Sequence, residues 1–105
     1  MEDSKTERGF DITEFVDTYG AKCSLQASSS AMENKIWFGV NDADPKIMVS
    51  KAKENGIEPI GNNGWMEFPI SKDVLLNTRM HLNREQVEKL LPYLKRFVET
   101  GDLHE

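Results

Sequence analysis

The most regular hydrophobic pattern lies near the C-terminus, where apolar residues recur at spacings of three and four from Val87 to Val98. This spacing is typical of an amphipathic helix with one apolar stripe. Asn83, with Gln86 three residues later, has the pattern of a capping box, and Gly101 is placed to end the helix. The stripe comprises Val87, Leu90, Leu91, Leu94, Phe97 and Val98. We therefore predict a C-terminal helix that packs against a β-sheet.

Pro92 falls inside this helix. It has no amide hydrogen to donate to the carbonyl of Glu88 and it crowds that carbonyl, which costs about 3 kcal/mol in a straight helix. The apolar stripe nevertheless continues across it with little change of phase. We predict a kink near Pro92 that lets the helix follow a twisted sheet, in preference to a functional hinge.

The residues before the helix favour β-strands. Residues 10–30 follow a mixed two-residue alternation that is broken by a glycine and a lysine, which predicts a hairpin turning at residues 19–22. The stretch KIWFGV, residues 35–40, is apolar on both faces and predicts a central strand. On such a strand Trp37 and Phe38 point to opposite faces.

Two further segments are less regular. The stretch DPKIMVSKAKENG permits a short helix capped by Asp44 and stopped by Gly56, or a strand followed by one helical turn, and we favour the second. The stretch WMEFPI predicts a strand that lies at a sheet edge or ends at Pro69, because Pro69 cannot donate a ladder hydrogen bond. The last strand is predicted in DVLLNTRMHL, where Arg79 and His81 share one side.

These elements predict an α+β fold, with a single antiparallel β-sheet of about five strands, or a sandwich-like arrangement, packed by an amphipathic helix kinked near Pro92. The chain of 105 residues has the size of one domain. Residues 1–9 are polar and lack periodicity, which predicts a flexible tail. Residues 10–105 are then expected to form a single α+β domain.

Composition narrows the class of function. The net charge is −5, with 13 basic and 18 acidic side chains, which argues against direct nucleic-acid binding. The acidic excess belongs to residues 1–44, where solubility is the simpler explanation and attraction of a basic partner the alternative. The apolar runs are too short to span a membrane and residues 1–8 lack a signal-peptide core, so we expect a cytoplasmic protein. Cys23 is the single cysteine and is expected to be a small buried residue.

The candidate ligand site lies where the last strand meets the helix. Arg79 and His81 share a side of the strand and precede the helix start at Asn83, where free amides favour an anion. The simpler interpretation, which we favour, is that Arg79 pairs with a surface carboxylate and His81 is solvated. Lys22 or Lys35 from a neighbouring chain would complete such a site. Trp37 is expected in the core, although exposed on a sheet face it would stack on a base.

The stretches YGAKCSLQASSSA, KIWFGVNDADPKI and DVLLNTRMHLNREQVEKLLPYLKRFVETGDL resemble segments of a family of small uncharacterised accessory proteins of bacteriophage and prophage genomes. The resemblance covers most of residues 15–103 and is sharpest in TRMHLNREQVEKLLPYLKRFVETG. It implies an accessory protein made in an infected bacterial cell. It brings no activity, so no catalytic residue is carried over.

Three hypotheses follow. The first is a non-enzymatic, homo-oligomeric binding protein that counteracts host defence by sequestering a nucleotide-type signal. The second is a module that binds and inhibits a host protein through its acidic N-terminal part. The third and weakest is a small nucleotide-processing enzyme with His81 as base, since no orienting carboxylate is evident. We predict no catalytic residue, no metal and no cofactor.

Overall fold

The computed structural model describes residues 1–30 and 32–105, which form two compact units. The first unit combines Met1–Asn41 with Thr78–Glu105, and the second is Asp42–Asn77. The sequence predicts one domain over residues 10–105, and the structure has two units instead. The reason is that the inserted segment folds on a small sheet and core of its own.

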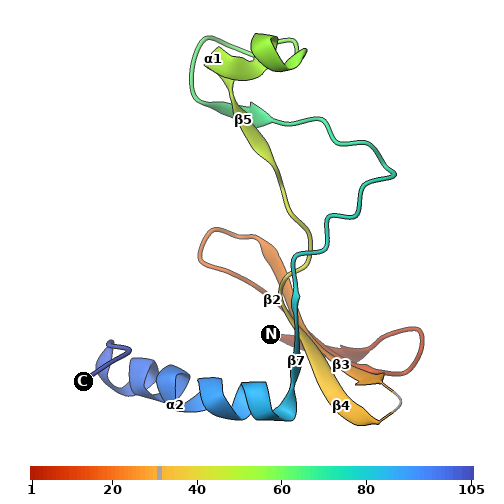
Figure 1. The fold of residues 1–105 in the computed structure, drawn as a ribbon, viewed down its shortest axis with the longest axis vertical. Coiled ribbons are helices and arrows are strands. Elements are labelled where there is room, and N and C mark those ends of the chain that lie inside the picture. Colours follow the sequence, from red (N-terminus) through yellow and green to blue (C-terminus); the bar gives the residue numbers. More distant parts are fainter. Residues whose placement is uncertain (31) are drawn as a thin grey trace. The chain divides into compact units, whose positions relative to one another are not determined.

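The first unit is built on a five-stranded antiparallel sheet with the strand order β1-β2-β3-β4-β7 (Figure 1). Its strands are β1 (Glu2–Lys5), β2 (Asp11–Val16), β3 (Lys22–Ser30), β4 (Glu33–Val40) and β7 (Met80–Asn83). The predicted α+β class and five-stranded antiparallel sheet are confirmed. The predicted hairpin joins β2 to β3, where Asp17 donates its amide to the carbonyl of Ala21 at 3.0 Å. β4 lies between β3 and β7, so the strand predicted to be central is an inner strand.

The register of β4 separates two faces of the sheet. Trp37 lies opposite Gln26 of β3 and His81 of β7. Phe38, which follows it, packs near Phe15 of β2 with ring centroids 6.2 Å apart. The prediction that Trp37 and Phe38 point to opposite faces is therefore confirmed.

The first residues of the chain form a strand, and the predicted tail over residues 1–9 is wrong. β1 pairs with β2 along its whole length, with Lys5 opposite Asp11. The side chains of these two residues also form an ion pair. Thr13 donates its hydroxyl to the Asp3 carboxylate at 2.8 Å. Because all four residues of this edge strand are exposed, it shows none of the hydrophobic alternation from which strands are recognised.

The second unit has its own small core. It contains β5 (Lys46–Met48), helix α1 (Val49–Ala52), the 3₁₀ turn η1 (Lys53–Asn55) and β6 (Trp65–Glu67). β5 and β6 pair antiparallel. Val49, Ala52 and Met66 are buried together, with Ile47 and Ile57 packed against them. The strand followed by a helical turn is confirmed, and β6 ends before Pro69 as expected.

Helix α2 (Arg84–Thr100) begins and ends as its caps specify. The Asn83 side chain accepts from the Gln86 amide, and the Asn83 amide donates to the Gln86 side chain, both at 2.9 Å. At the other end Gly101 has φ of 81° and donates its amide to the carbonyl of Phe97. Only a residue without a Cβ adopts this left-handed conformation readily. The helix runs through Pro92, and the kink there stays a prediction.

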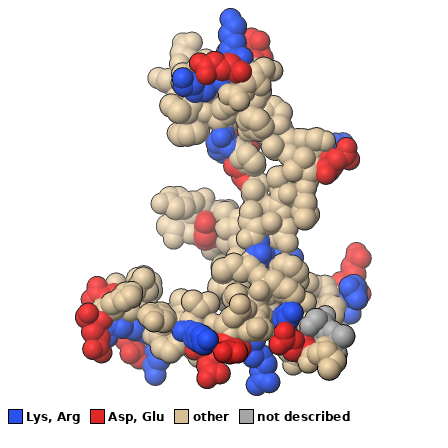
Figure 2. Space-filling model, viewed as in Figure 1, with Lys and Arg blue, Asp and Glu red and all other residues tan. Residues whose placement is uncertain are grey.

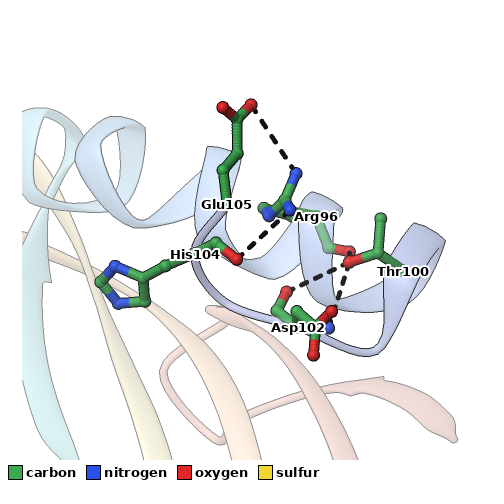
Figure 3. Close-up of polar contacts among 5 residues, drawn as sticks. All are labelled: Arg96, Thr100, Asp102, His104 and Glu105. Atoms are coloured by element: carbon green, nitrogen blue, oxygen red, sulfur yellow. Dashed lines mark hydrogen bonds and ion pairs between the residues drawn. The ribbon is translucent and has the colours of Figure 1, made fainter.

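The C-terminal residues fold back onto the last turns of α2 (Figure 3). The Arg96 guanidinium donates to the carbonyl of His104 at 3.2 Å and lies 3.9 Å from the Glu105 carboxylate. The Thr100 hydroxyl donates to the carbonyl of Arg96 at 2.9 Å, and the Asp102 amide donates to that hydroxyl at 3.1 Å. These contacts hold the end of the helix to its own tail.

The apolar stripe of α2 does not lie across the sheet. Its residues contribute no buried side chain, and Figure 1 shows the helix projecting from the end of β7. Strand β7 ends at Asn83 and the helix begins at Arg84, so no connecting loop exists in which the chain could reverse over the sheet. The prediction that the stripe packs on the sheet within one chain is therefore wrong.

Candidate functional site

One face of the five-stranded sheet gathers aromatic and polar side chains, and we call it the Trp37 face. It carries Ser24, Gln26 and Ser28 of β3, Trp37 of β4, and Arg79 and His81. The imidazole of His81 stacks on the indole of Trp37, with ring centroids 3.9 Å apart and an interplanar angle of 12°. The Arg79 guanidinium carbon lies 5.5 Å from the centroid of the same indole. Trp37 is half-buried between these two residues.

Arg79 reaches across β4 to the polar residues of β3. Its guanidinium donates to the Ser24 hydroxyl at 3.1 Å and to the Gln26 side-chain oxygen at 2.8 Å. Gly39 of β4 lies opposite Ser24, and a Cβ at that glycine would stand 3.5 Å from the Arg79 Cα. That distance is ordinary van der Waals contact, so glycine is favoured here by its backbone φ of 139°.

Ser24 is the buried member of this hydrogen-bond network. It is 1% exposed, and its hydroxyl donates to the Asn41 side-chain oxygen at 2.6 Å. A buried hydroxyl is costly unless it is hydrogen-bonded, and here it has both Asn41 and Arg79 as partners. The network holds the Arg79 side chain against the sheet beside Trp37.

A hollow of about 410 Å³ lies on the side of Trp37 that faces β3. Its wall is the turn between β1 and β2, which is closed by a 2.8 Å hydrogen bond from the Thr6 amide to the carbonyl of Phe10. The guanidinium carbon of Arg8 lies 5.6 Å from the centroid of the Phe10 ring. The residues lining the hollow are Thr6, Glu7, Arg8, Phe10, Gln26, Ala27, Ser28 and Trp37. We call it the Trp37 pocket.

Most groups that line the Trp37 pocket suit an aromatic anion, and Glu7 is the one carboxylate among them. Trp37 and Phe10 offer aromatic surface, and Arg8 offers a guanidinium. Ser28 and Gln26 add neutral hydrogen-bonding groups, and the Ser28 hydroxyl lies 3.3 Å from Nε2 of His81. The pocket therefore continues into the stacked pair of His81 and Trp37.

Charge is mixed over the visible surface of this unit. Figure 2 shows cationic and anionic side chains interspersed along α2, with no single basic patch. Within the part of the chain that the structure describes, no group of three or more His, Cys, Asp or Glu side chains is placed to hold a metal ion. No described helix has the length and apolar content needed to cross a membrane.

The structure brings together three of the predicted site residues. Arg79 and His81 both lie on the Trp37 face, which confirms that they share a side of the strand. Trp37 lies between Arg79 and His81, and both residues lie against its indole. Arg79 bonds to the neutral residues Ser24 and Gln26, a pairing that the sequence did not indicate.

Of the other three predicted residues, Lys35 and Asn83 are opposite each other and form the next cross-strand pair on the same face of the sheet as Trp37 and His81. Asn83 is engaged in the capping box of α2, so its side chain is turned to its own helix. Lys35 pairs with Glu33 at 3.4 Å and lines a hollow at the start of α2. Lys22 lines a third hollow beside Glu14. The anion site predicted at the helix start stays a prediction.

Sequence reasoning missed the residues that complete the pocket. The sequence pattern places Arg8 in a tail and Phe10 at the start of the domain, because it carries no sign of the pairing of β1 with β2. The polar face of β3 was visible in the alternation of CSLQAS, where Cys23 and Leu25 alternate with Ser24, Gln26 and Ser28. Cys23 is buried as expected.

Comparison of the chain with protein-family models, with curated proteins and with solved structures finds no match.

Proposed function

We propose that this protein is a non-enzymatic binding protein that takes a small anionic, nucleotide-type ligand in the Trp37 pocket. The observation that carries the proposal is the joint lining of one hollow by Trp37, Phe10 and Arg8. Stacking of a base on an aromatic side chain contributes about 1–3 kcal/mol. A guanidinium adds a strong and directional hydrogen bond to phosphate.

The arrangement of the pocket suggests how such a ligand lies. His81 covers one side of the Trp37 ring, so the base contacts the side that faces Gln26 and Phe10. Arg8 then meets the phosphate, and Ser28 or Gln26 bonds to the base or sugar. Arg79 acts behind the pocket by holding the polar residues of β3 in place.

The biological role that we propose is sequestration. The resemblance to phage accessory proteins supports a protein that works in the cytoplasm of an infected bacterial cell. A nucleotide-type signal of host defence has the aromatic and anionic character that the pocket fits. Binding without turnover removes such a signal from its receptor.

A second candidate is a module that binds a basic surface of a host protein. The strand register supports this second candidate, because it places Glu2 of β1 opposite Glu14 of β2. Both residues are exposed, together with Asp3 of the edge strand β1. Binding through these carboxylates would weaken steeply with salt and would not require Trp37.

Catalysis by His81 has less support. Its Nε2 lies 3.3 Å from the Ser28 hydroxyl, which is a spacing that a nucleophile and base share. The imidazole is stacked on Trp37, however, and among the described residues no carboxylate bonds to it to orient it as a base. Chromatography of a nucleotide incubated with the protein distinguishes binding from turnover.

Isothermal titration calorimetry tests the proposal. Ribonucleoside monophosphates and cyclic dinucleotides serve as probes, and we expect at least one to bind saturably and to be recovered intact. Arg8→Ala should weaken that binding at least tenfold, because a charge-assisted hydrogen bond is lost. Arg84→Ala is the matched control, since Arg84 lies at the start of α2 and outside the pocket. Absence of binding by every probe, or equal loss in both variants, would reject the proposal.

A further inference from the structure

The apolar stripe of α2 is exposed. Leu90, Leu91, Leu94, Phe97 and Val98 are between 41% and 83% exposed. Of the residues described in this unit, only Cys23 and Ser24 are buried. We infer that two copies of this chain pair through α2, with the helices antiparallel and the two stripes in contact.

A second copy fits this surface because of the charges beside the stripe. On a helix of 3.6 residues per turn, Glu88 and Lys95 lie along one border of the stripe. Gln86, Tyr93 and Thr100 lie along the other border and are neutral at pH 7. When two identical helices pack antiparallel, each border faces the same border of the other helix. Glu88 of each copy then faces Lys95 of the other, and the pair forms twice.

The alternative orientation lacks this complementarity. In a parallel pair, the border with Glu88 and Lys95 would face the neutral border of the second helix. The charged side chains would then have no charged partner across the interface. The charge pattern of α2 therefore selects the antiparallel pair.

The same register places apolar residues opposite each other. With Glu88 facing Lys95 of the second copy, Val87 faces Phe97 and Leu90 faces Leu94. A groove of about 380 Å³ lies beside Val87 and Leu91 and is also lined by Ile36 and Leu82. The second copy's Phe97 and Val98 are placed to fill this groove, so the groove and the stripe form one continuous surface.

The folded-back tail leaves the stripe accessible. Arg96, which holds the tail through His104 and Glu105, lies on the side of α2 away from the stripe. Figure 3 shows these contacts gathered around the Arg96 side chain. The tail therefore fixes the last turn of the helix without covering Leu94 or Val98, which remain exposed.

Sedimentation velocity of the full chain over a range of concentrations tests the inference. The wild-type protein should sediment as a dimer. Glu88→Lys and Lys95→Glu should each weaken the dimer about tenfold, because each places like charges opposite each other twice. An equimolar mixture of the two variants should recover the dimer, since each mixed pair restores opposite charges. Lys89→Glu, on the helix face away from the stripe, should leave the dimer unchanged.

Each result bears on the inference. A wild-type monomer at all concentrations, or single charge reversals that leave the dimer intact, would overturn it. A mixture that stays monomeric would overturn the antiparallel arrangement. Leu94→Asp should give a monomer whose far-ultraviolet circular dichroism is unchanged, because Leu94 is half-exposed in one copy. The inference does not depend on the ligand, so titration with nucleotides tests the proposed function separately.

Discussion

The imidazole of His81 lies almost flat on the indole of Trp37, with ring centroids 3.9 Å apart. The two residues come from neighbouring strands and are directly opposite in the register. The stacked imidazole limits the motion of the indole, so Trp37 offers a fixed aromatic surface to the pocket beside it. A fixed surface binds a ligand at lower entropic cost than a mobile one.

Removal of His81 should therefore weaken ligand binding without abolishing it. We expect His81→Ala to cost about 0.5–1.5 kcal/mol of binding free energy, the contribution typical of an aromatic pair. Calorimetry measures this change. His104→Ala is the matched control, because His104 lies in the C-terminal tail beside Tyr93. An unchanged affinity in the His81 variant would show that the stacked pair does not support the pocket.

Arg79 is expected to matter for stability as well as for binding. Arg79→Ala removes two hydrogen bonds to β3 and one partner of the buried Ser24 hydroxyl. Loss of a partner to a buried polar group costs about 1–3 kcal/mol, so the free energy of unfolding of the first unit should fall by that amount. Urea unfolding followed by the signal of Trp37 measures it, in a Trp65→Phe background. No loss of stability would mean that the network across Gly39 contributes little.

The Asn83→Ala variant distinguishes a ligand in the Trp37 pocket from a ligand at the start of α2. Asn83→Ala removes the side-chain oxygen that caps the Gln86 amide, which should cost about 1 kcal/mol of stability. We expect nucleotide affinity to stay unchanged, because Asn83 does not line the Trp37 pocket. Parallel thermal unfolding and calorimetry report the two quantities. A large loss of nucleotide affinity would indicate that the ligand binds at the start of α2 and not in the Trp37 pocket.

Lys46 gives the second unit a defined dependence on pH. Hydrogen bonds to Glu67 and then to Asp44 raise the pKa of the Lys46 ammonium above its ordinary value of 10.5. Because the folded pKa is the higher one, the stabilisation is present below pH 10.5 and is lost as the pH rises through the folded value. Glu67→Gln should bring the pKa of Lys46 back toward 10.5. Titration of the Lys46 side chain by NMR measures this, and an unshifted pKa in the variant would contradict it.

Local signals explain what the sequence could predict. The Asn83 and Gln86 capping box, the hairpin after β2 and the shared side of Arg79 and His81 each depend on a few neighbouring residues. These features were predicted correctly, because short-range chemistry decides them. The sequence also predicts strands at β5 and β6. It does not predict that the segment containing them forms a separate unit.

Features that depend on distant residues could not be predicted in this way. Strand β1 is exposed on both faces, so its pairing with β2 leaves no trace in the hydrophobic pattern. Arg8 and Phe10 enter the pocket only through that pairing. The stripe of α2 identifies a helix that must bury one face, but it does not say whether the sheet or a second copy covers it.

The most direct test of the Trp37 pocket is an NMR titration of the uniformly ¹⁵N-labelled protein with the nucleotide that binds best by calorimetry. We expect the indole N–H signal of Trp37 and the amide signals of Arg8, Phe10 and Ser28 to shift together and to saturate. The indole N–H signal of Trp65, in the second unit, should stay in place. Shifts confined to the first turn of α2, or the absence of any shift at Trp37, would contradict the account.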